Sequence, residues 1–285
     1  MPKGFYDEAV QSGGIAVVTG AASGVGKVAA LRFAEAGFGV LLADLPGDAL
    51  DAATSEIRAA ARDGAPVEGL ATDVSRDADV AALADRAFEM GEVAVVMNNA
   101  GIARNTTAWG DMDSWRAMAE VNLFGVLRGV HAFTQRMVNA GRPAVIINTG
   151  SKQGITTPPG NPGYNLTKAG VRVISEQLAH ELRASGAPIS VHLFIPGFTY
   201  TGMTGQRHAT KPDAAWTSEQ CVDHFLARML AGDFYVLCPD NDVTPDLDRR
   251  RVTWAFGDIV ENRTALSRWD PEYKADYAAF EGREG

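Results

Sequence analysis

The sequence predicts an α/β fold, a doubly wound parallel sheet of the Rossmann type with seven strands and a C-terminal extension. Short apolar, β-branched runs alternate with longer Ala-rich helical patterns from residue 15 to about residue 237. The apolar runs are continuous, which is typical of strands that are buried on both faces of a parallel sheet. A glycine-rich turn joins the first run to the first helical pattern. We expect ligands to bind beyond the carboxyl ends of the strands.

The predicted elements alternate along the whole core. Strands are predicted at residues 15–19, 39–43, 67–71, 93–98, 144–148, 189–195 and 234–237. Helices are predicted near residues 25–36, 47–63, 77–90, 111–139, 164–185 and 217–231. We expect one domain of the Rossmann type over residues 1–285, with its core at about 13–238 and an extension at 239–285. The aromatic content of the extension predicts an ordered segment packed on the domain.

Composition excludes several classes of function. The 285 residues are 46% hydrophobic and 21% charged, as in a globular enzyme, and the net charge of −9 argues against a nucleic-acid or anionic-membrane partner. No apolar run reaches the ~18 residues of a membrane span, and the start has no apolar signal-peptide region, so a cytoplasmic protein is expected. Neither the two cysteines, Cys221 and Cys238, nor the five histidines show metal-ligand spacing, so no metal is predicted.

The first strand runs into a turn that reads T-G-A-A-S-G-V-G at residues 19–26. Its glycines allow a tight turn and close approach of the backbone to a pyrophosphate, which the N-terminus of the following helix attracts. The alternative is a tight turn whose glycines only serve packing. The predicted cofactor contacts here are Thr19, Gly20, Ser23, Gly24, Val25 and Gly26.

Asp44 at the end of the second strand predicts NAD as the cofactor. A carboxylate at this position can accept hydrogen bonds from the 2′-hydroxyl of an adenosine ribose and would repel a 2′-phosphate. Neither Leu45 nor Ser23 supplies the cation that NADP would need, and Lys27 has an equally good interpretation as a solvated side chain. The alternative role for Asp44 is that of a helix cap.

The third and fourth strands end in further candidate contacts. Asp73 is predicted to hold the adenine amino group or, alternatively, to cap the next helix. The fourth strand ends in the sequence N-N-A-G at residues 98–101, where small residues allow close approach to the adenosine. Asn99, Ala100 and Gly101 are the predicted contacts, and a purely structural role for the asparagine pair has equal weight.

Tyr164 and Lys168 carry the predicted chemistry. They stand four residues apart at the start of a helical pattern, so both side chains lie on one face, one turn apart. Lowering a tyrosine pKa by about three units needs roughly 4 kcal/mol, and an ammonium at ~4 Å supplies about that much at an effective dielectric of ~20. Ser151, just after an apolar strand, offers a hydroxyl to a substrate oxygen. The pair alone is weak evidence, because this spacing also occurs by chance on exposed helices.

Together, these segments resemble the short-chain dehydrogenase/reductase family in its single-domain form. The matching motifs, in order, are T-G-A-A-S-G-V-G at 19–26, D-V at 73–74, N-N-A-G at 98–101, the asparagine of V-N-L-F-G at 121–125, N-T-G-S at 148–151, Y-N-L-T-K at 164–168 and P-G-F-T-Y-T at 196–201. The resemblance covers about residues 13–238. The branch of the family that acts on sugar nucleotides has a different glycine spacing.

The resemblance implies a role for each matched residue. Ser151 would orient the substrate, Tyr164 would be the general acid/base, and Lys168 would bind the nicotinamide ribose and lower the tyrosine pKa. Asn122 would hold a proton-relay water beside Lys168. Thr201 and the backbone around Thr199 would hold the nicotinamide carboxamide. The remaining predicted cofactor contacts are Leu45, Val74, Tyr164, Pro196 and Gly197.

The predicted substrate side departs from the family pattern. Lys152 and Gln153 follow Ser151 where small residues are usual, and residues 156–163 are rich in proline and glycine. Residues 198–217 are predicted to form a lid. Gln153 and Met203 are the predicted substrate contacts; Arg104, Arg207 and His208 are weaker candidates.

The resulting prediction is an NAD-dependent oxidoreductase that interconverts a secondary alcohol and a ketone or other carbonyl by hydride transfer. The alternatives are a dehydratase or epimerase on the same fold, and a dinucleotide-sensing protein without turnover. We expect a small-molecule substrate and a homodimer or homotetramer, because long helices with apolar faces at 111–139 and 164–185 suit a two-fold interface.

Overall fold

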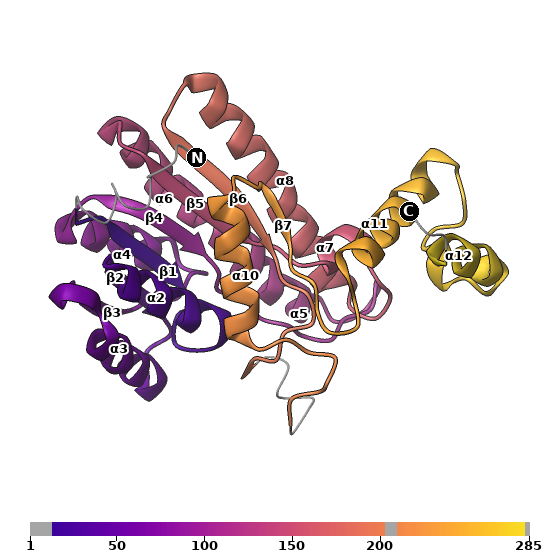
Figure 1. Ribbon diagram of the computed structural model, residues 1–285, viewed down its shortest axis with the longest axis horizontal. Helices are drawn as coiled ribbons and strands as arrows, with labels where there is room; N and C mark the ends of the chain where they lie inside the picture. Colours follow the sequence, from indigo (N-terminus) through magenta and orange to yellow (C-terminus); the bar gives the residue numbers. More distant parts are fainter. Residues whose placement is uncertain (1–12, 203–209, 283–285) are drawn as a thin grey trace.

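The computed structural model describes residues 13–202 and 210–282. It confirms the predicted Rossmann-like architecture, with seven parallel strands in the order β3-β2-β1-β4-β5-β6-β7 (Figure 1). The strands are β1 (Ile15–Thr19), β2 (Gly39–Asp44), β3 (Val67–Ala71), β4 (Val93–Asn98), β5 (Ala144–Thr149), β6 (Ile189–Ile195) and β7 (Tyr235–Leu237). The strand order reverses between β1 and β4, which is where such sheets bind their ligands.

Helices cover both faces of the sheet. One face carries α2 (Gly24–Ala36), α3 (Asp48–Ala60) and α10 (Ser218–Leu230). The other carries α4 (Asp77–Met90), α6 (Gly125–Ala140) and α8 (Pro162–Ser185). Within the described residues, short 3₁₀ helices also occur at η1 (Arg62–Gly64), η3 (Ser267–Trp269) and η4 (Pro271–Tyr273). No helix within the described residues combines the length and apolar character that crossing a membrane would require.

The side chains of each central strand divide between two apolar layers. In β1, Ala16 and Val18 pack under α2 and α10, whereas Ile15 and Val17 pack under α4 and α6. All four are at most 1% exposed. Because successive residues of a strand point to opposite faces, a strand that is covered on both sides must be apolar throughout. This explains the continuous apolar runs of the sequence.

The helix predicted at 111–139 is divided into three parts. α5 (Met112–Met118) leads into η2 (Ala119–Phe124), a turn of π-helix, before α6 begins. Within η2, Asn122 is fully buried and bonds both backbone groups of Ile102. Further along, Gly129 lies so close to β4 that an added Cβ would be 2.0 Å from the Asn98 Oδ1 atom. The wider turn places an asparagine toward the sheet edge, which uniform helical periodicity could not predict.

The C-terminal segment forms α11 (Pro245–Val260) and α12 (Lys274–Glu281), which the sequence patterns did not predict as helices. α11 packs against the short helix α7 (Gln153–Thr156), and beyond that contact the segment reaches away from the sheet (Figure 1). Trp254 is 6% exposed because the segment folds back on it, with the ring centroids of Tyr277 and Phe280 each 5.2 Å away. The expected packing on the sheet domain therefore holds for α11, which contacts α7 and whose Phe256 ring lies 5.9 Å from the Arg172 guanidinium of α8, whereas α12 packs on α11.

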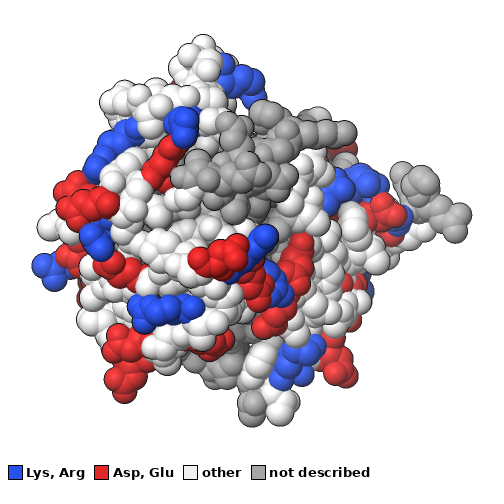
Figure 2. Space-filling view, turned by 60° about the vertical axis from the view of Figure 1, so that its left-hand side comes forward, with Lys and Arg blue, Asp and Glu red and all other residues white. Residues whose placement is uncertain are grey.

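Acidic and basic side chains are intermixed on the face shown in Figure 2, so the excess of acidic residues does not form a single-sign patch there. Several of them pair between elements. Arg32 of α2 lies 2.7 Å from Asp223 of α10, and Arg86 of α4 lies 2.7 Å from Glu68 of β3. Exposed pairs of this kind contribute little to stability individually.

Candidate active site

The glycine turn after β1 leaves room for a ligand at the N-terminus of α2. Gly20 and Gly24 have φ of +68° and +55°, values that side chains other than glycine rarely adopt. An added Cβ at Gly26 would lie 2.1 Å from the Gly20 carbonyl oxygen, so only glycine allows the turn to close against the helix. The Ser23 side chain makes no capping bond to α2, and no acidic residue lies in the first turn. The turn therefore fits a dinucleotide pyrophosphate at a helix N-terminus.

Asp44 is held rigidly beside this turn. Its Oδ2 atom accepts a hydrogen bond from the Ala22 N–H at 2.8 Å, and its Oδ1 atom accepts one from the Leu45 N–H at 2.8 Å. It does not cap α3, whose N-cap residue is Gly47, so the capping alternative is wrong. Lys27 pairs with Glu56 at 2.6 Å, which agrees with its interpretation as a surface side chain. A carboxylate fixed at this strand end suits a ribose hydroxyl.

The remaining strand-end residues make mainly structural contacts. Asp73 accepts hydrogen bonds from the Ser75 N–H and Oγ–H, which lower the pKa of its carboxyl group, and the N-cap residue of α4 is Arg76. The Val74 side chain is buried, and its Cγ2 atom lies 2.9 Å from an added Cβ at Gly125. The Asp73 N–H also donates to Asp79 Oδ2 at 3.0 Å, so the Asp73 carboxylate is the part of this residue that remains for a cofactor.

Both members of the asparagine pair tie strand ends together. The Asn98 side chain donates to Asn148 Oδ1 at 2.8 Å, and Asn148 in turn donates to Ser175 Oγ at 3.0 Å. Asn99 donates to the Thr19 carbonyl oxygen at 3.1 Å and accepts from Thr149 Oγ1 at 3.2 Å. Of the two interpretations left open by the sequence, the structural one accounts for these side chains. Ala100 and Gly101 continue the same edge, where an added Cβ at Gly20 would lie 2.8 Å from the Ala100 Cα atom.

Tyr164 and Lys168 lie on the first two turns of α8. The helix begins at Pro162, and the side chain of the N-cap residue Asn161 accepts from the Tyr164 N–H at 3.3 Å. Lys168 is only 4% exposed. Its ammonium donates to the Thr149 carbonyl oxygen at 2.7 Å and lies 5.8 Å from the centroid of the Tyr164 ring. A lysine one helical turn from a tyrosine is therefore held at the end of β5, just before Ser151.

The pKa of Tyr164 is shifted in the direction opposite to the one expected from the sequence. Burial raises the pKa of Tyr164 above its ordinary value, and a hydrogen bond with Ser151 opposes that rise. Burial also lowers the pKa of Lys168 to about 8. The expected lowering of the tyrosine pKa by Lys168 is thus wrong for this arrangement. The physical reason is that the ammonium lies beside the ring and is bonded to a backbone carbonyl, while the phenol oxygen is desolvated.

The side chains of Asn122 and Lys168 both lie close to Gly101. An added Cβ at Gly101 would be 3.4 Å from the Asn122 Oδ1 atom and 3.8 Å from the Lys168 Nζ atom. The Asn122 amide also donates to Thr167 Oγ1 at 3.3 Å. The structure therefore brings together Asn122, Ser151, Tyr164 and Lys168 from η2, the end of β5 and α8, far apart in sequence.

The sequence matches the family described as short chain dehydrogenase over residues 14–212. This chain belongs to the short-chain dehydrogenase/reductase family. It is 36% identical to a 1-deoxy-11-beta-hydroxypentalenate dehydrogenase of Streptomyces exfoliatus, covering 86% of this chain and 87% of the relative. It is 37% identical to a cis-4-hydroxycyclohexanecarboxylate dehydrogenase of Sinomonas cyclohexanicum, covering 66% of this chain and 74% of the relative.

Two solved structures of the family resemble this fold and were determined with different cofactors. A short chain dehydrogenase/reductase from Burkholderia phymatum, in complex with NAD, matches with a TM-score of 0.66 and 33% identity over 94% of this chain and 92% of its own. A short-chain dehydrogenase from Sphingobium yanoikuyae, in complex with NADPH, matches with a TM-score of 0.70 and 26% identity over 95% and 96% of the two chains. The family fold therefore binds either dinucleotide, and local residues select between them.

In this short-chain dehydrogenase/reductase, the segment after β6 turns back toward the glycine turn. Gly197 follows Pro196 and lies so close to the end of β7 that an added Cβ would be 2.7 Å from the Cys238 carbonyl oxygen. Thr199 pairs with Trp216 in an isolated bridge. An added Cβ at Gly24 would lie 3.3 Å from the Thr201 side chain. Thr199 and Thr201 are thus carried to the same edge as the predicted pyrophosphate turn.

Of the two predicted substrate contacts, Gln153 and Met203, the structure describes Gln153. Gln153 begins α7, donates its backbone N–H to Ser151 Oγ at 3.2 Å, and exposes its side chain. Met203 and the weaker candidates Arg207 and His208 lie outside the described residues. Within residues 13–202 and 210–282, no three His, Cys, Asp or Glu side chains are grouped as a metal would require.

Two contributors to this edge were missed from the sequence. The backbone carbonyl oxygen of Thr149 accepts a hydrogen bond from the Lys168 ammonium. Thr106 donates to Asn161 Oδ1 at 2.8 Å and accepts from the Gly163 N–H at 3.0 Å, and so ties the loop after β4 to the start of α8. For Thr106 no sequence signal existed, because a threonine in a loop has no characteristic spacing to its partner.

Proposed function

We propose that this protein is an NAD-dependent oxidoreductase that interconverts a secondary alcohol and a ketone, as one catalytic domain with residues 239–285 as an extension. The observation that carries the proposal is the arrangement of Tyr164 and Lys168 on one face of α8, with the Lys168 Nζ atom 5.8 Å from the Tyr164 ring centroid and bonded to the Thr149 carbonyl oxygen just before Ser151, at the sheet edge that also holds the glycine turn. A proton carrier and a second hydroxyl meet where a dinucleotide and an alcohol would meet.

The chain's own residues account for the proton chemistry. Tyr164 takes the proton of the alcohol, or returns it to the carbonyl oxygen, while Ser151 hydrogen-bonds the same oxygen and stabilises its developing charge. Lys168 places a positive charge near the ring and offers N–H donors toward a ribose, and Asn122 lies beside it. The dinucleotide, when bound at the glycine turn, supplies or accepts the hydride. Holding the reactants in place gives much of the rate.

The relatives suggest the class of substrate. The Sinomonas relative carries a hydroxycyclohexane in its name, and the Streptomyces relative a hydroxylated pentalenate. We propose a hydroxyl on a saturated ring as the reacting group. An assay of NADH formation at 340 nm over a panel of cyclic and acyclic secondary alcohols tests this, and the reverse assay uses the matching ketones. Isomerised or dehydrated product without net NADH change would favour a dehydratase or epimerase, and binding without any turnover would favour a sensing protein.

We expect NAD to bind at least tenfold more tightly than NADP, a difference of about 1.4 kcal/mol. The reason is the fixed carboxylate of Asp44, which repels a 2′-phosphate, beside Leu45, which is 60% exposed and offers no cation. Isothermal titration measures both affinities. Asp44→Asn should reduce the ratio of the NADP to the NAD dissociation constant. Asp48→Asn, at an exposed acidic residue of the first turn of α3, should leave that ratio unchanged. Equal wild-type affinities would refute this assignment.

We further propose a homodimer or homotetramer. Most of the apolar residues on α6 and α8 cover the chain's own sheet, as Phe133 and Val171 do. However, Phe124, Leu166 and Val173 point outward and are 42%, 56% and 47% exposed. Three outward apolar side chains on η2 and α8 support a two-fold interface of these helices, and light scattering at micromolar concentration gives the mass that tests it.

A further inference from the structure

Lys152 is part of a buried charge cluster next to the catalytic residues. Its Nζ atom lies 2.6 Å from Asp248 Oδ2 and 3.6 Å from Asp240 Oδ2. The side chains of Lys152, Asp240 and Asp248 are 18%, 5% and 6% exposed. Two carboxylates this deeply buried need a cation, because removing the partner of a buried charge is strongly destabilising. Lys152 is that cation, and it directly follows Ser151.

The three members of this cluster belong to three different segments of the site. Lys152 lies in the turn that carries Ser151. Asp240, in the loop after β7, also accepts a hydrogen bond from the Phe198 N–H at 3.1 Å and lies 3.0 Å from an added Cβ at Gly197. Asp248 lies in the first turn of α11. The cluster therefore joins the proposed substrate turn, the segment after β6 and the C-terminal extension.

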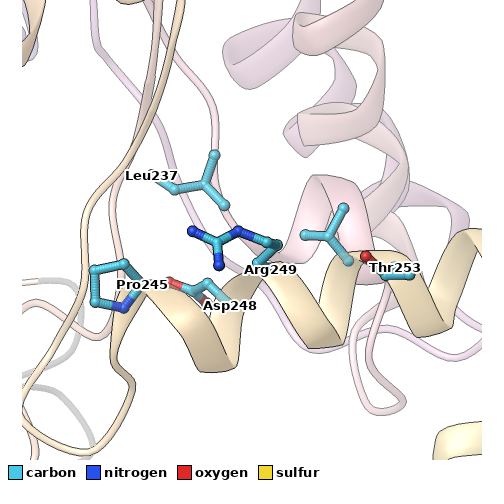
Figure 3. A pocket seen from close by; sticks show the side chains of 6 residues that line it. Leu237, Pro245, Asp248, Arg249 and Thr253 are labelled. Carbon is cyan, nitrogen blue, oxygen red and sulfur yellow. The ribbon is translucent and has the colours of Figure 1, made fainter. Parts of the chain in front are cut away.

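Apolar packing alone does not hold α11 in place. A cavity of about 270 Å³ lies between Leu237 of β7 and the first two turns of α11, lined also by Pro245, Asp248, Arg249, Val252 and Thr253 (Figure 3). Beyond this region the extension packs mainly on itself around Trp254. The ion pair of Lys152 with Asp248, together with the contact between α11 and α7, is thus a principal connection between the extension and the site.

We propose that Lys152 is a positioning residue: it holds the Ser151 turn against α11, so that the extension forms one wall of the substrate side. The proposal rests on the dehydrogenase function proposed above. It also explains why a lysine occupies a position where a small residue would suffice for the chemistry of Ser151. A displacement of about 1 Å at a reacting group can cost up to ~100-fold in rate, so a loosened Ser151 turn should be visible in the kinetics.

The test compares Lys152→Met, Lys152→Arg and Asp248→Asn with a matched control, Arg249→Met. Arg249 is the next residue on α11; its side chain is 73% exposed and pairs with Asp246 of the same helix, so its removal should leave KM and kcat unchanged. For Lys152→Met and Asp248→Asn we expect KM for the alcohol to rise about tenfold and kcat to fall, while the NAD dissociation constant stays within about twofold. Lys152→Arg should retain most of the activity, because a guanidinium can also bridge two carboxylates.

Hydrogen exchange provides a second readout that needs no substrate. Backbone amides of α11 should exchange faster in Lys152→Met and Asp248→Asn, while those of α4 should not. If Lys152→Met fails to fold, Asp248→Asn carries the test, since it leaves Lys152 with Asp240. Unchanged KM and kcat in an active, folded Asp248→Asn protein would overturn the proposal, as would unchanged exchange of α11. Because exchange is independent of turnover, a wild-type protein that oxidises no alcohol would refute the proposed function and still leave this proposal measurable.

Discussion

Tyr164→Phe should lower kcat by about three orders of magnitude while leaving NAD affinity within about twofold. The substitution keeps the ring in its half-buried position on α8 and removes only the oxygen that hydrogen-bonds Ser151. Steady-state NADH absorbance measures the loss, and titration with NAD measures the affinity. Tyr235→Phe is the matched control, because Tyr235 is 50% exposed on β7 and its hydroxyl bonds Glu176 at the surface. A Tyr164→Phe enzyme with the wild-type rate would contradict the mechanism.

The pH dependence of the wild-type enzyme follows from the same residue. Burial raises the pKa of Tyr164, so its hydroxyl keeps its proton at neutral pH. Carbonyl reduction uses the protonated tyrosine as an acid, whereas alcohol oxidation needs the deprotonated form as a base. We therefore expect oxidation to accelerate as the pH rises above neutral, and reduction to slow only when the pH approaches the ordinary tyrosine pKa of about 10 and exceeds it. Oxidation that is faster at pH 6 than at pH 9 would show that another group carries the proton.

Lys168→Met should have the second largest effect, about a hundredfold loss in kcat/KM with weaker NAD binding. With a pKa of about 8, Lys168 is mostly protonated at pH 7, and its charge lies 5.8 Å from the Tyr164 ring centroid. The variant loses this positive charge beside the ring and the N–H donors directed toward a ribose, so both turnover and NAD binding should weaken. Lys274→Met, at an exposed lysine of α12, is the control.

A stability measurement separates this loss of function from misfolding. Because burial lowers the pKa of Lys168 below its unfolded value, the folded state prefers the neutral amine. The charged lysine therefore opposes folding below about pH 8, and this cost disappears as the pH rises from there toward the unfolded pKa of ~10.5. Methionine removes the buried charge but leaves the Thr149 carbonyl without its donor. We expect the thermal midpoint of Lys168→Met at pH 7 not to fall below that of the wild type. A large decrease would mean that the lysine is mainly structural.

Local sequence patterns were sufficient to predict the sheet and its order of elements. The patterns of the central strands are unambiguous because helices cover these strands on both faces, so their residues are almost all apolar, as Ile15, Ala16, Val17 and Val18 are. The glycine turn is equally readable, since the conformation of Gly20 and the close approach at Gly26 exclude other residues. Tyr164 and Lys168 could be paired because an α-helix determines which neighbours share a face.

Only the tertiary structure decided how these groups behave. Within the π-helical turn η2, the Asn122 side chain bonds the backbone of Ile102, a partner twenty positions away. The tyrosine pKa moved opposite to the expected direction, since spacing along a helix fixes proximity but says nothing about desolvation. Lys152 departs from the family pattern in the sequence, and only the fold places Asp240 and Asp248 beside it. Long-range contacts and burial depend on where the whole chain places each segment, and no local periodicity encodes them.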